Sequence, residues 1–203
     1  MTAIGSRANS ARGSAPAAES IIVRSARDGY KAIYSAQMIE DIVHWPSGTV
    51  RIAWHGREGN ELPVTGAHGF CFHNERVLVC DISGRGPTIP GGHLDDHEST
   101  VECLVREALE EACVELADAT LLGFVEADHR ANSKFNGQYP VRSVQAIYRA
   151  DVSVVREFDA RHESTDRRFV TPDELPLVHH EWNAVLQEAL RTALATDSGI
   201  TSK

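Results

Sequence analysis

The chain has 203 residues, enough to bury one substantial core and too few for two independent enzymatic domains. Because 42% of the residues are hydrophobic and 24% charged, wholesale disorder is excluded. The formal net charge of -9 argues against a broad nucleic-acid surface, since such partners are held mainly by Lys and Arg. We expect one domain with appended ends and no nucleic-acid partner.

Residues 1–20 are rich in Ala, Ser, Gly and Arg, which predicts a flexible tail, although an organelle transit peptide is an alternative. No run has the length of a secretory signal or a membrane span, so we expect no membrane association. The cysteines show no metal-type or redox-type spacing and read as reduced thiols. The expected location is the cytoplasm.

Residues 21–49 are predicted to be a partly helical N-terminal extension, because apolar residues between Tyr30 and His44 partly fit one helical face. Trp45 to Gly48 breaks this pattern, and residues 49–56 (TVRIAWHG) predict a strand. We place the main domain over residues 50–195 and a tail over residues 196–203.

The middle of the chain alternates strand signals with loops. Phe70 and Phe72 precede the turn His73-Asn74-Glu75, and the apolar run 77–80 follows it, which indicates a hairpin. RGPTIPGG reads as a loop, and residues 120–127 and 141–152 read as strands. The segment 128–140 between those strands is long for an idle connection and is a candidate functional loop.

Two helices are predicted near the C-terminal end, one from a capping pattern and one from an apolar stripe. Thr171-Pro172-Asp173-Glu174 has the pattern of a helix start, and the last helix has one apolar stripe that includes Val185 and Leu190. A more charged helix is expected from about Thr100 to Cys113. Together with the strands, these helices predict a mixed α/β domain.

Glu107, Glu110 and Glu111 lie three and four residues apart on this charged helix, so their side chains are neighbours and repel each other. A glutamate-rich face is usually only solvated. A hard divalent ion such as Mg²⁺, however, turns the repulsion into an attraction that all three carboxylates share.

The spacing matches a known signature. Gly92, Glu98, Arg106-Glu107, Glu110-Glu111 and the aliphatic residues Ala108 and Val114 resemble the box of the Nudix hydrolases, of the MutT-like or ADP-ribose pyrophosphatase-like kind. Six of the seven fixed box positions match, which chance would give roughly once in 10⁶ registers. The resemblance implies an α/β/α sandwich with a mixed sheet from about Val50 to Leu194.

The same resemblance implies a pyrophosphohydrolase in which Glu107, Glu110, Glu111 and the Gly92 carbonyl hold Mg²⁺ or Mn²⁺. Arg106 would orient a box glutamate. Glu98 would support the site, or is a simple first-turn acid.

The catalytic base is expected among the late acids. Many family members use a glutamate from a late loop, which points to Glu163 ahead of the last strand. Glu126, Asp128 and Glu157 compete with it. A box glutamate such as Glu107 or Glu110 is the other option for a catalytic role.

Substrate contacts are predicted in the long loop. Arg130 and Lys134 could meet phosphates, and Phe135 or Tyr139 could stack on a ring, although the loop could also be merely solvated. The histidine pairs, such as His93 with His97, do not make a zinc motif by spacing.

One box position departs from the family, because Cys113 stands where the box has Gly. A left-handed helix end there would cost a residue with a β-carbon roughly 1–2 kcal/mol. Either the backbone takes another path or the strain is accommodated. A reactive-thiol role for Cys113 is not favoured.

The substrate is expected to be a nucleoside diphosphate linked to another group. ADP-ribose and other nucleotide sugars are favoured slightly over nucleoside triphosphates, and the N-terminal extension is similar in length to that of some dimeric members, so a homodimer is an option. The rival hypothesis is a Nudix-fold ligand sensor without turnover. Retention of Glu107, Glu110 and Glu111 favours the enzyme.

Overall fold

The structure is a computed structural model that describes residues 38–57 and 61–197. Its elements, in chain order, are β1 (Glu40–Trp45), β2 (Gly48–His55), β3 (Val64–His73), β4 (Arg76–Ile82), β5 (Gly86–Thr88), β6 (Gly91–His93), α1 (Thr100–Ala112), β7 (Val114–Asp128), β8 (Arg142–Val155), β9 (Ser164–Val170), α2 (Leu175–Val178) and α3 (Ala184–Asp197).

The described strands form one mixed sheet, in the order β1-β2-β7-β8-β3-β4-β5, with β6 on β3 and β9 on β4. The pair β3–β8 is parallel, with His68 opposite Ile147, and the other pairs are antiparallel. The predicted β3–β4 hairpin is confirmed. Asn74 and Glu75 form its tip with φ of 49° and 63°, the left-handed conformation of two-residue hairpin turns.

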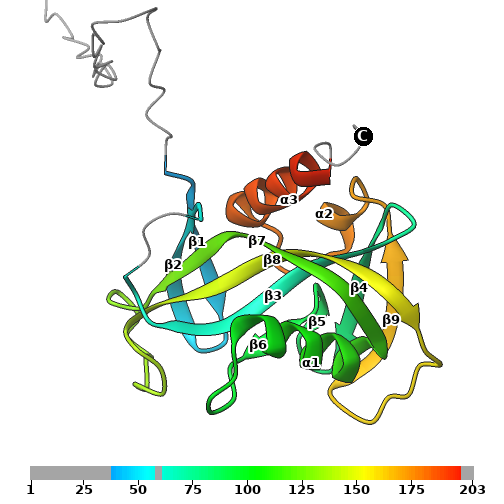
Figure 1. Cartoon of the computed structure of the whole chain (residues 1–203). Coiled ribbons are helices and arrows are strands. Elements are labelled where there is room, and N and C mark those ends of the chain that lie inside the picture. Colours follow the sequence, from blue (N-terminus) through cyan, green and yellow to red (C-terminus); the bar gives the residue numbers. More distant parts are fainter. Residues whose placement is uncertain (1–37, 58–60, 198–203) are drawn as a thin grey trace, which may run out of the picture. The chain divides into compact units, whose positions relative to one another are not determined.

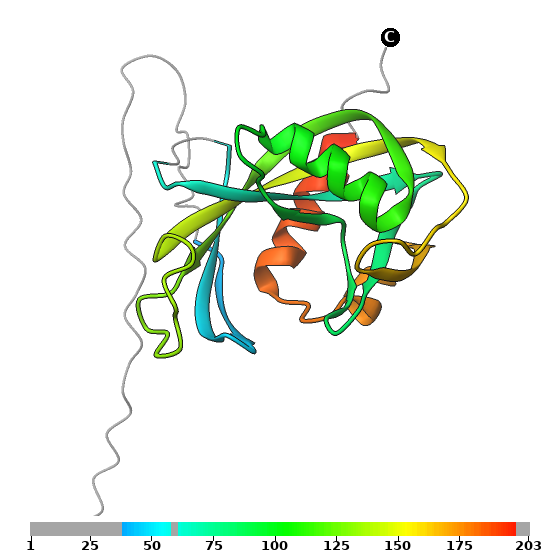
Figure 2. The same cartoon turned by 90° about the horizontal axis from the view of Figure 1, so that it is seen from below.

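Helices cover both faces of the curled sheet (Figure 1). One face packs against α1 through a core that includes Leu78, Leu104 and Val114, and the other packs against α2 and α3 through Phe70, Leu175 and Leu190. Figure 2 shows α1 and α3 on opposite sides of the strands. The predicted α/β/α sandwich with a mixed sheet is therefore confirmed.

The N-terminal prediction is wrong for Glu40 to His44, which lie in a strand rather than a helix. In β1 the branched side chains Ile42 and Val43 alternate between exposed and buried positions, and pairing with β2 outweighs the partial helical spacing. Met38 and Ile39 are in neither a helix nor a strand, and residues 30–37 of that stretch lie outside the described residues, as does the predicted tail 1–20. The boundary predicted at residue 50 falls inside β2.

At the C-terminal end, the reciprocal hydrogen bonds of the predicted helix start are present, but the helix begins only at Leu175, with Glu174 as its N-cap. The Glu174 N–H donates to Thr171 Oγ1 (3.3 Å), and the Thr171 N–H donates to Glu174 Oε2 (2.8 Å). Residues 175–178 then form α2. The last helix buries Val185, Ala189 and Leu190 as predicted. It runs to Asp197, so the predicted start of the C-terminal tail, residue 196, lies inside the helix.

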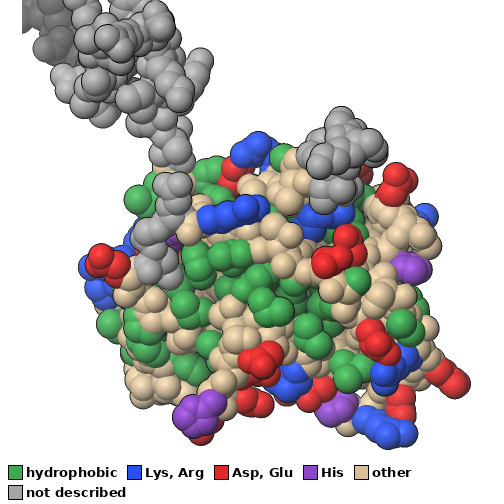
Figure 3. Space-filling model, in the orientation of Figure 1, with side chains coloured by type: hydrophobic (Ala, Val, Ile, Leu, Met, Phe, Trp, Pro, Cys, Tyr) green, Lys and Arg blue, Asp and Glu red, His purple; other side chains and the backbone are tan. Residues whose placement is uncertain are grey.

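On the face that Figure 3 shows, acidic and basic side chains of the described residues lie beside one another instead of gathering by sign. The described helices include none that is both long and apolar enough to span a membrane.

Candidate active site

The box residues are presented by α1, which begins at a complete capping box. Ser99 accepts from the Glu102 N–H (3.3 Å), and the Glu102 side chain accepts from the Ser99 N–H (2.8 Å). Leu104, Ala108 and Ala112 face the core. The helical period therefore puts the box glutamates on the flank of the helix that meets β6.

Arg106 joins the outer carboxylates. Its guanidinium donates to Glu98 (2.8 Å), Glu107 (2.9 Å) and Glu110 (3.3 Å). It also donates to the His93 carbonyl (3.1 Å). These bonds give Arg106 the orienting contacts that the sequence predicted, and the same guanidinium lowers the pKa of Glu98 to about 2, together with the Asp95 N–H.

Burial disfavours the ionised forms of Glu107 and Glu111. Burial raises the pKa of Glu111 to about 8, although the Gly91 N–H donates to its Oε2 at 3.1 Å. Burial also raises the pKa of Glu107, against the opposing effect of Arg106. A buried carboxylate whose ionised form is disfavoured gains most from a nearby cation.

Gly91 and Gly92 let other groups approach the backbone. A side-chain carbon on Gly92 would collide with the Glu107 carboxylate, and one on Gly91 would collide with His68 Nδ1 and with the Ala67 carbonyl. Within the described ranges, no three His, Cys, Asp or Glu side chains converge as a ready cation site. The hard-oxygen donors Glu107, Glu110, Glu111 and the glycine cradle nevertheless fit a divalent cation by their chemistry.

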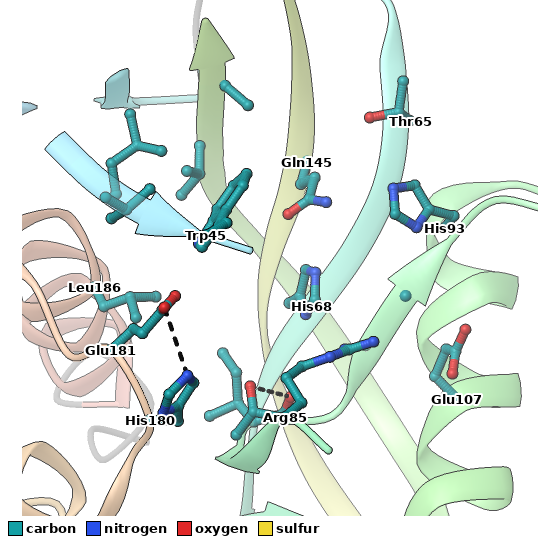
Figure 4. A pocket seen from close by; sticks show the side chains of 18 of the residues that line it. Trp45, Thr65, His68, Arg85, His93, Glu107, Gln145, His180, Glu181 and Leu186 are labelled. Atoms are coloured by element: carbon teal, nitrogen blue, oxygen red, sulfur yellow. Dashed lines mark hydrogen bonds and ion pairs between the residues drawn. The ribbon is translucent and has the colours of Figure 1, made fainter. Parts of the chain in front are cut away.

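These residues line a cavity of about 950 Å³. One side is formed by α1 and β6, with Glu107, Glu110 and Glu111. The far side is apolar and includes Trp45 and Leu186. Figure 4 shows His68 and Gln145 between these two sides, on the neighbouring strands β3 and β8. The cavity thus has an acidic end, a polar middle and an apolar end.

Glu163, the candidate base, lines this cavity from the segment before β9. It is close enough to influence the pKa values of Glu107 and Glu111, and its own side chain is 71% exposed. Among its rivals, Glu126 and Asp128 are buried but do not line the cavity, and Glu157 lines a separate, smaller pocket. The structure thus brings Glu163 to the box glutamates and does not bring its rivals there.

Of the four substrate-binding residues predicted in the long loop, one lines the cavity and three do not. Tyr139 lines the cavity and stacks on His93, with ring centroids 4.2 Å apart. Arg130, Lys134 and Phe135 are not among the lining residues. Arg130 chelates Asp128 (2.6–3.0 Å), and Phe135 stacks on His129 (4.7 Å). Their role in substrate binding stays a prediction.

Sequence reasoning missed most of the cavity wall opposite α1. Trp45, His68 and Gln145 come from three strands far apart in the chain, and Arg85 comes from the β4–β5 turn. Six of the ten histidines line the cavity, namely His68, His93, His129, His162, His179 and His180. Their abundance was visible in the sequence, but only the topology brings them together.

The comparisons with known proteins agree with this geometry. The NUDIX domain family model matches residues 63–191, which is more than half of the chain. The chain belongs to the NUDIX domain family. None of the curated proteins matches it at a significant level.

Three solved structures illustrate the NUDIX fold. The pyrophosphohydrolase BsRppH of Bacillus subtilis is similar at a TM-score of 0.60 and 19% identity, covering 81% of this chain and 100% of its own. An ADP-ribose pyrophosphatase from Streptococcus suis reaches 0.50 at 17% identity, covering 70% and 96%. The NUDIX domain of Shewanella oneidensis NrtR, complexed with ADP ribose, reaches 0.50 at 18% identity, covering 66% and 90%.

The departure from the NUDIX box at Cys113 does not change the backbone path. Cys113 caps α1 in the left-handed conformation, with φ 51° and ψ 44°. Its Sγ accepts from the Asp159 N–H (3.4 Å), and its carbonyl accepts from Arg156 N–H (3.0 Å) and Arg167 (3.1 Å). The strain of a β-carbon is thus accommodated by contacts with the segment that leads to Glu163.

Proposed function

We propose that this NUDIX protein hydrolyses a nucleoside diphosphate linked to another moiety, with a divalent metal ion. Family membership supports a pyrophosphohydrolase. The observation that carries the proposal is that one cavity is lined by the α1 carboxylates, by Glu163 and by an apolar end. Among these carboxylates, Glu111 is buried and its pKa is raised. Such a cavity can take a diphosphate at one end and a flat, largely apolar group at the other.

Glu107, Glu110, Glu111 and the Gly92 carbonyl would hold Mg²⁺ or Mn²⁺. A bound cation would neutralise charge on the phosphoryl oxygens and favour deprotonation of the attacking water. Support comes from the burial of Glu111 and from the glycine that leaves room for the Glu107 carboxylate. Arg106 keeps the outer carboxylates oriented, and Glu98 fixes Arg106 in turn.

Glu163 is proposed as the base that takes a proton from the attacking water. Its position on the cavity wall and its long contact with Arg85 leave its carboxylate accessible. Glu107 and Glu110 are the alternatives, but both already accept hydrogen bonds from Arg106.

The substrate is proposed to be ADP-ribose or another nucleotide sugar, ahead of a nucleoside triphosphate. Trp45 and Leu186 offer the apolar end of the cavity to a base, and His68 and Gln145 offer hydrogen bonds to the group between base and phosphate. The polar wall around His179 and His180 leaves room for a second group beyond the diphosphate.

A ligand sensor without turnover is the second candidate. The NUDIX domain of NrtR, solved as a complex with ADP ribose, shares this fold, and binding of such a ligand without turnover is the competing activity to test. Retention of the three glutamates on α1 favours turnover. A cytoplasmic location fits the four free cysteines, and a homodimer stays a prediction.

A panel of nucleotides with Mg²⁺, followed by phosphate or nucleoside-monophosphate detection, tests the proposal. We expect hydrolysis of a nucleotide sugar by the wild type and its loss in Glu111→Gln. Hydrolysis that is unchanged by this substitution would discredit the metal assignment. Tight binding of ADP-ribose with no turnover of any compound would favour the sensor.

A further inference from the structure

Without a metal ion, a diphosphate in this cavity would face the carboxylates of α1 and of Glu163 directly, so a nearby side-chain cation would favour its binding. Two arginines line the cavity, Arg85 and Arg106. Two of the lining histidines do not fill this role, because burial lowers the pKa of His68 and His179 to about 4 and leaves both neutral near pH 7.

Arg106 is already committed to other groups. It bonds to three glutamates and to a backbone carbonyl, and its side chain is only 26% exposed. Taking a phosphate would break bonds that hold the outer carboxylates in place. Its guanidinium therefore has little capacity left for a substrate.

Arg85 is held much more loosely. It lies on the turn between β4 and β5, where its backbone N–H donates to the Ile82 carbonyl (3.1 Å). Its guanidinium is 3.8 Å from Glu163, at the outer limit of an ion pair, and both side chains are more than half exposed. Such a pair contributes little stability and is easily exchanged.

The direction of Arg85 also suits a phosphate. In Figure 4 its side chain extends across the cavity toward the side on which Glu107 lies. Its positive charge acts on both sides of that space: it opposes the burial that raises the pKa of Glu111, and it adds to the burial that lowers the pKa values of His68 and His93. A diphosphate beside the α1 carboxylates would lie within reach of this guanidinium.

We propose that Arg85 binds the substrate's diphosphate and that this contact replaces its ion pair with Glu163. The inference rests on the proposed function for its substrate class and adds a binding residue to it. In the free protein, Arg85 has only this long contact with Glu163. When the phosphate oxygens take over the guanidinium, the Glu163 carboxylate is released to accept the proton of the attacking water.

Metal-free binding of ADP tests the contact without relying on turnover. By titration calorimetry in EDTA, Arg85→Gln should bind ADP about 10- to 100-fold more weakly than the wild type, because it loses charge-assisted hydrogen bonds. Arg85→Lys should lose less ADP affinity, about three- to tenfold, because lysine keeps the positive charge but lacks the paired N–H donors of a guanidinium. Adenosine, which lacks phosphate, should bind all three proteins equally.

The matched control is Arg191→Gln. Arg191 is similarly exposed (67%) and also has one carboxylate partner, Glu188, but it lies on α3 outside the cavity. We expect its ADP affinity to equal that of the wild type. An Arg85→Gln protein that binds ADP as tightly as Arg191→Gln would overturn the inference, whether or not the wild type hydrolyses nucleotides.

A second set of variants tests the exchange. Glu163→Gln should tighten metal-free ADP binding about two- to fivefold, since Arg85 is then free in advance. In the Arg85→Gln background the same change should have almost no effect. An equal gain in both backgrounds would show that Glu163 acts on the anion directly and would overturn the exchange. If ADP binds through Arg85 but no substrate is hydrolysed, only the proposed function fails.

Discussion

Two groups of acidic side chains in this protein have opposite electrostatic surroundings. The β7 cluster, Glu126 and Asp128, is buried and is surrounded by Arg51, Arg130 and Arg142. The α1 cluster, Glu107, Glu110 and Glu111, shares one arginine, Arg106, which does not bond to Glu111 in the described contacts. The first group already has its cations, and the second is short of them.

The pKa shifts follow this difference. Hydrogen bonds from Arg130 hold the pKa of Asp128 well below its usual range. Burial alone would raise the pKa of Glu126, but hydrogen bonds from Arg142 and His55 outweigh it and lower the pKa. At Glu111, burial outweighs the hydrogen bond from the Gly91 N–H and raises the pKa to about 8. We infer that the β7 cluster serves stability and the α1 cluster serves binding.

The largest expected effect is on activity. Glu111→Gln should lower kcat/KM for a nucleotide sugar at least about 100-fold, because a metal-binding carboxylate is lost. Its unfolding free energy in EDTA should be no lower than that of the wild type, since the neutral amide can still accept from the Gly91 N–H. Hydrolysis kinetics and urea denaturation measure the two quantities. A variant that loses stability but keeps its activity would reverse the assignment.

The β7 cluster should behave in the opposite way. Glu126→Gln should lower the unfolding free energy by about 2–4 kcal/mol, because a buried ion-pair network loses one charge. Its kcat/KM should stay within about twofold of the wild type, since Glu126 does not line the cavity. Glu115→Gln is the control: Glu115 pairs with Arg156 at the surface, and its loss should cost at most about 1 kcal/mol.

Metal binding should separate the clusters a second time. At a Mg²⁺ concentration of 100 times its Kd, the wild type should gain about 2.7 kcal/mol of unfolding free energy. Glu126→Gln should gain the same amount, and Glu111→Gln should gain almost nothing. Thermal denaturation with and without EDTA measures these gains. Equal gains in all three proteins would place the ion elsewhere.

Acid should weaken the β7 cluster. The folded pKa of Asp128 is depressed below its ordinary value of 3.8, so its contribution is present above that value and is lost as the pH falls through the folded pKa. Asp128→Asn should therefore be less stable than the wild type at pH 7, and this difference should shrink below about pH 4. Urea midpoints from pH 7 to pH 2 measure it. A constant difference would argue against the ion pair.

The smallest effect is expected at Cys113. Cys113→Gly relieves the strain of the left-handed backbone conformation. It also removes the Sγ contact with Asp159 and increases the conformational entropy of the unfolded chain. These terms oppose each other, so the unfolding free energy should change by no more than about 1 kcal/mol. A much larger loss would mean that the thiol is needed to hold the segment before Glu163.

The α1 cluster could be predicted from sequence because its members share one helix, where a fixed period sets which side chains are neighbours. The helix bounds and the glutamate flank follow from that period, whereas the orienting role of Arg106 was implied by the family resemblance. The strands of the β3–β4 hairpin and the closing helix were predictable for the same local reason.

The cavity wall opposite α1 could not be predicted, because no local period joins Trp45, His68 and Gln145. They meet through the pairing of β3 with β8 and of β2 with β7, which are long-range contacts. The strand at Glu40–Trp45 was missed because its partner β2, not its own apolar spacing, determines it. The contact of Arg130 with Asp128 was not predicted either, and the role of Arg130 at the substrate stays a prediction.

The most direct measurement is an anomalous-scattering map of a crystal soaked in Mn²⁺. A metal site on α1 predicts a peak bounded by carboxylate oxygens of Glu107, Glu110 and Glu111 near the Gly92 carbonyl, and no peak in Glu111→Gln. A map without a peak there, with Arg106 still bonded to Glu107 and Glu110 and Glu111 still buried, would contradict it.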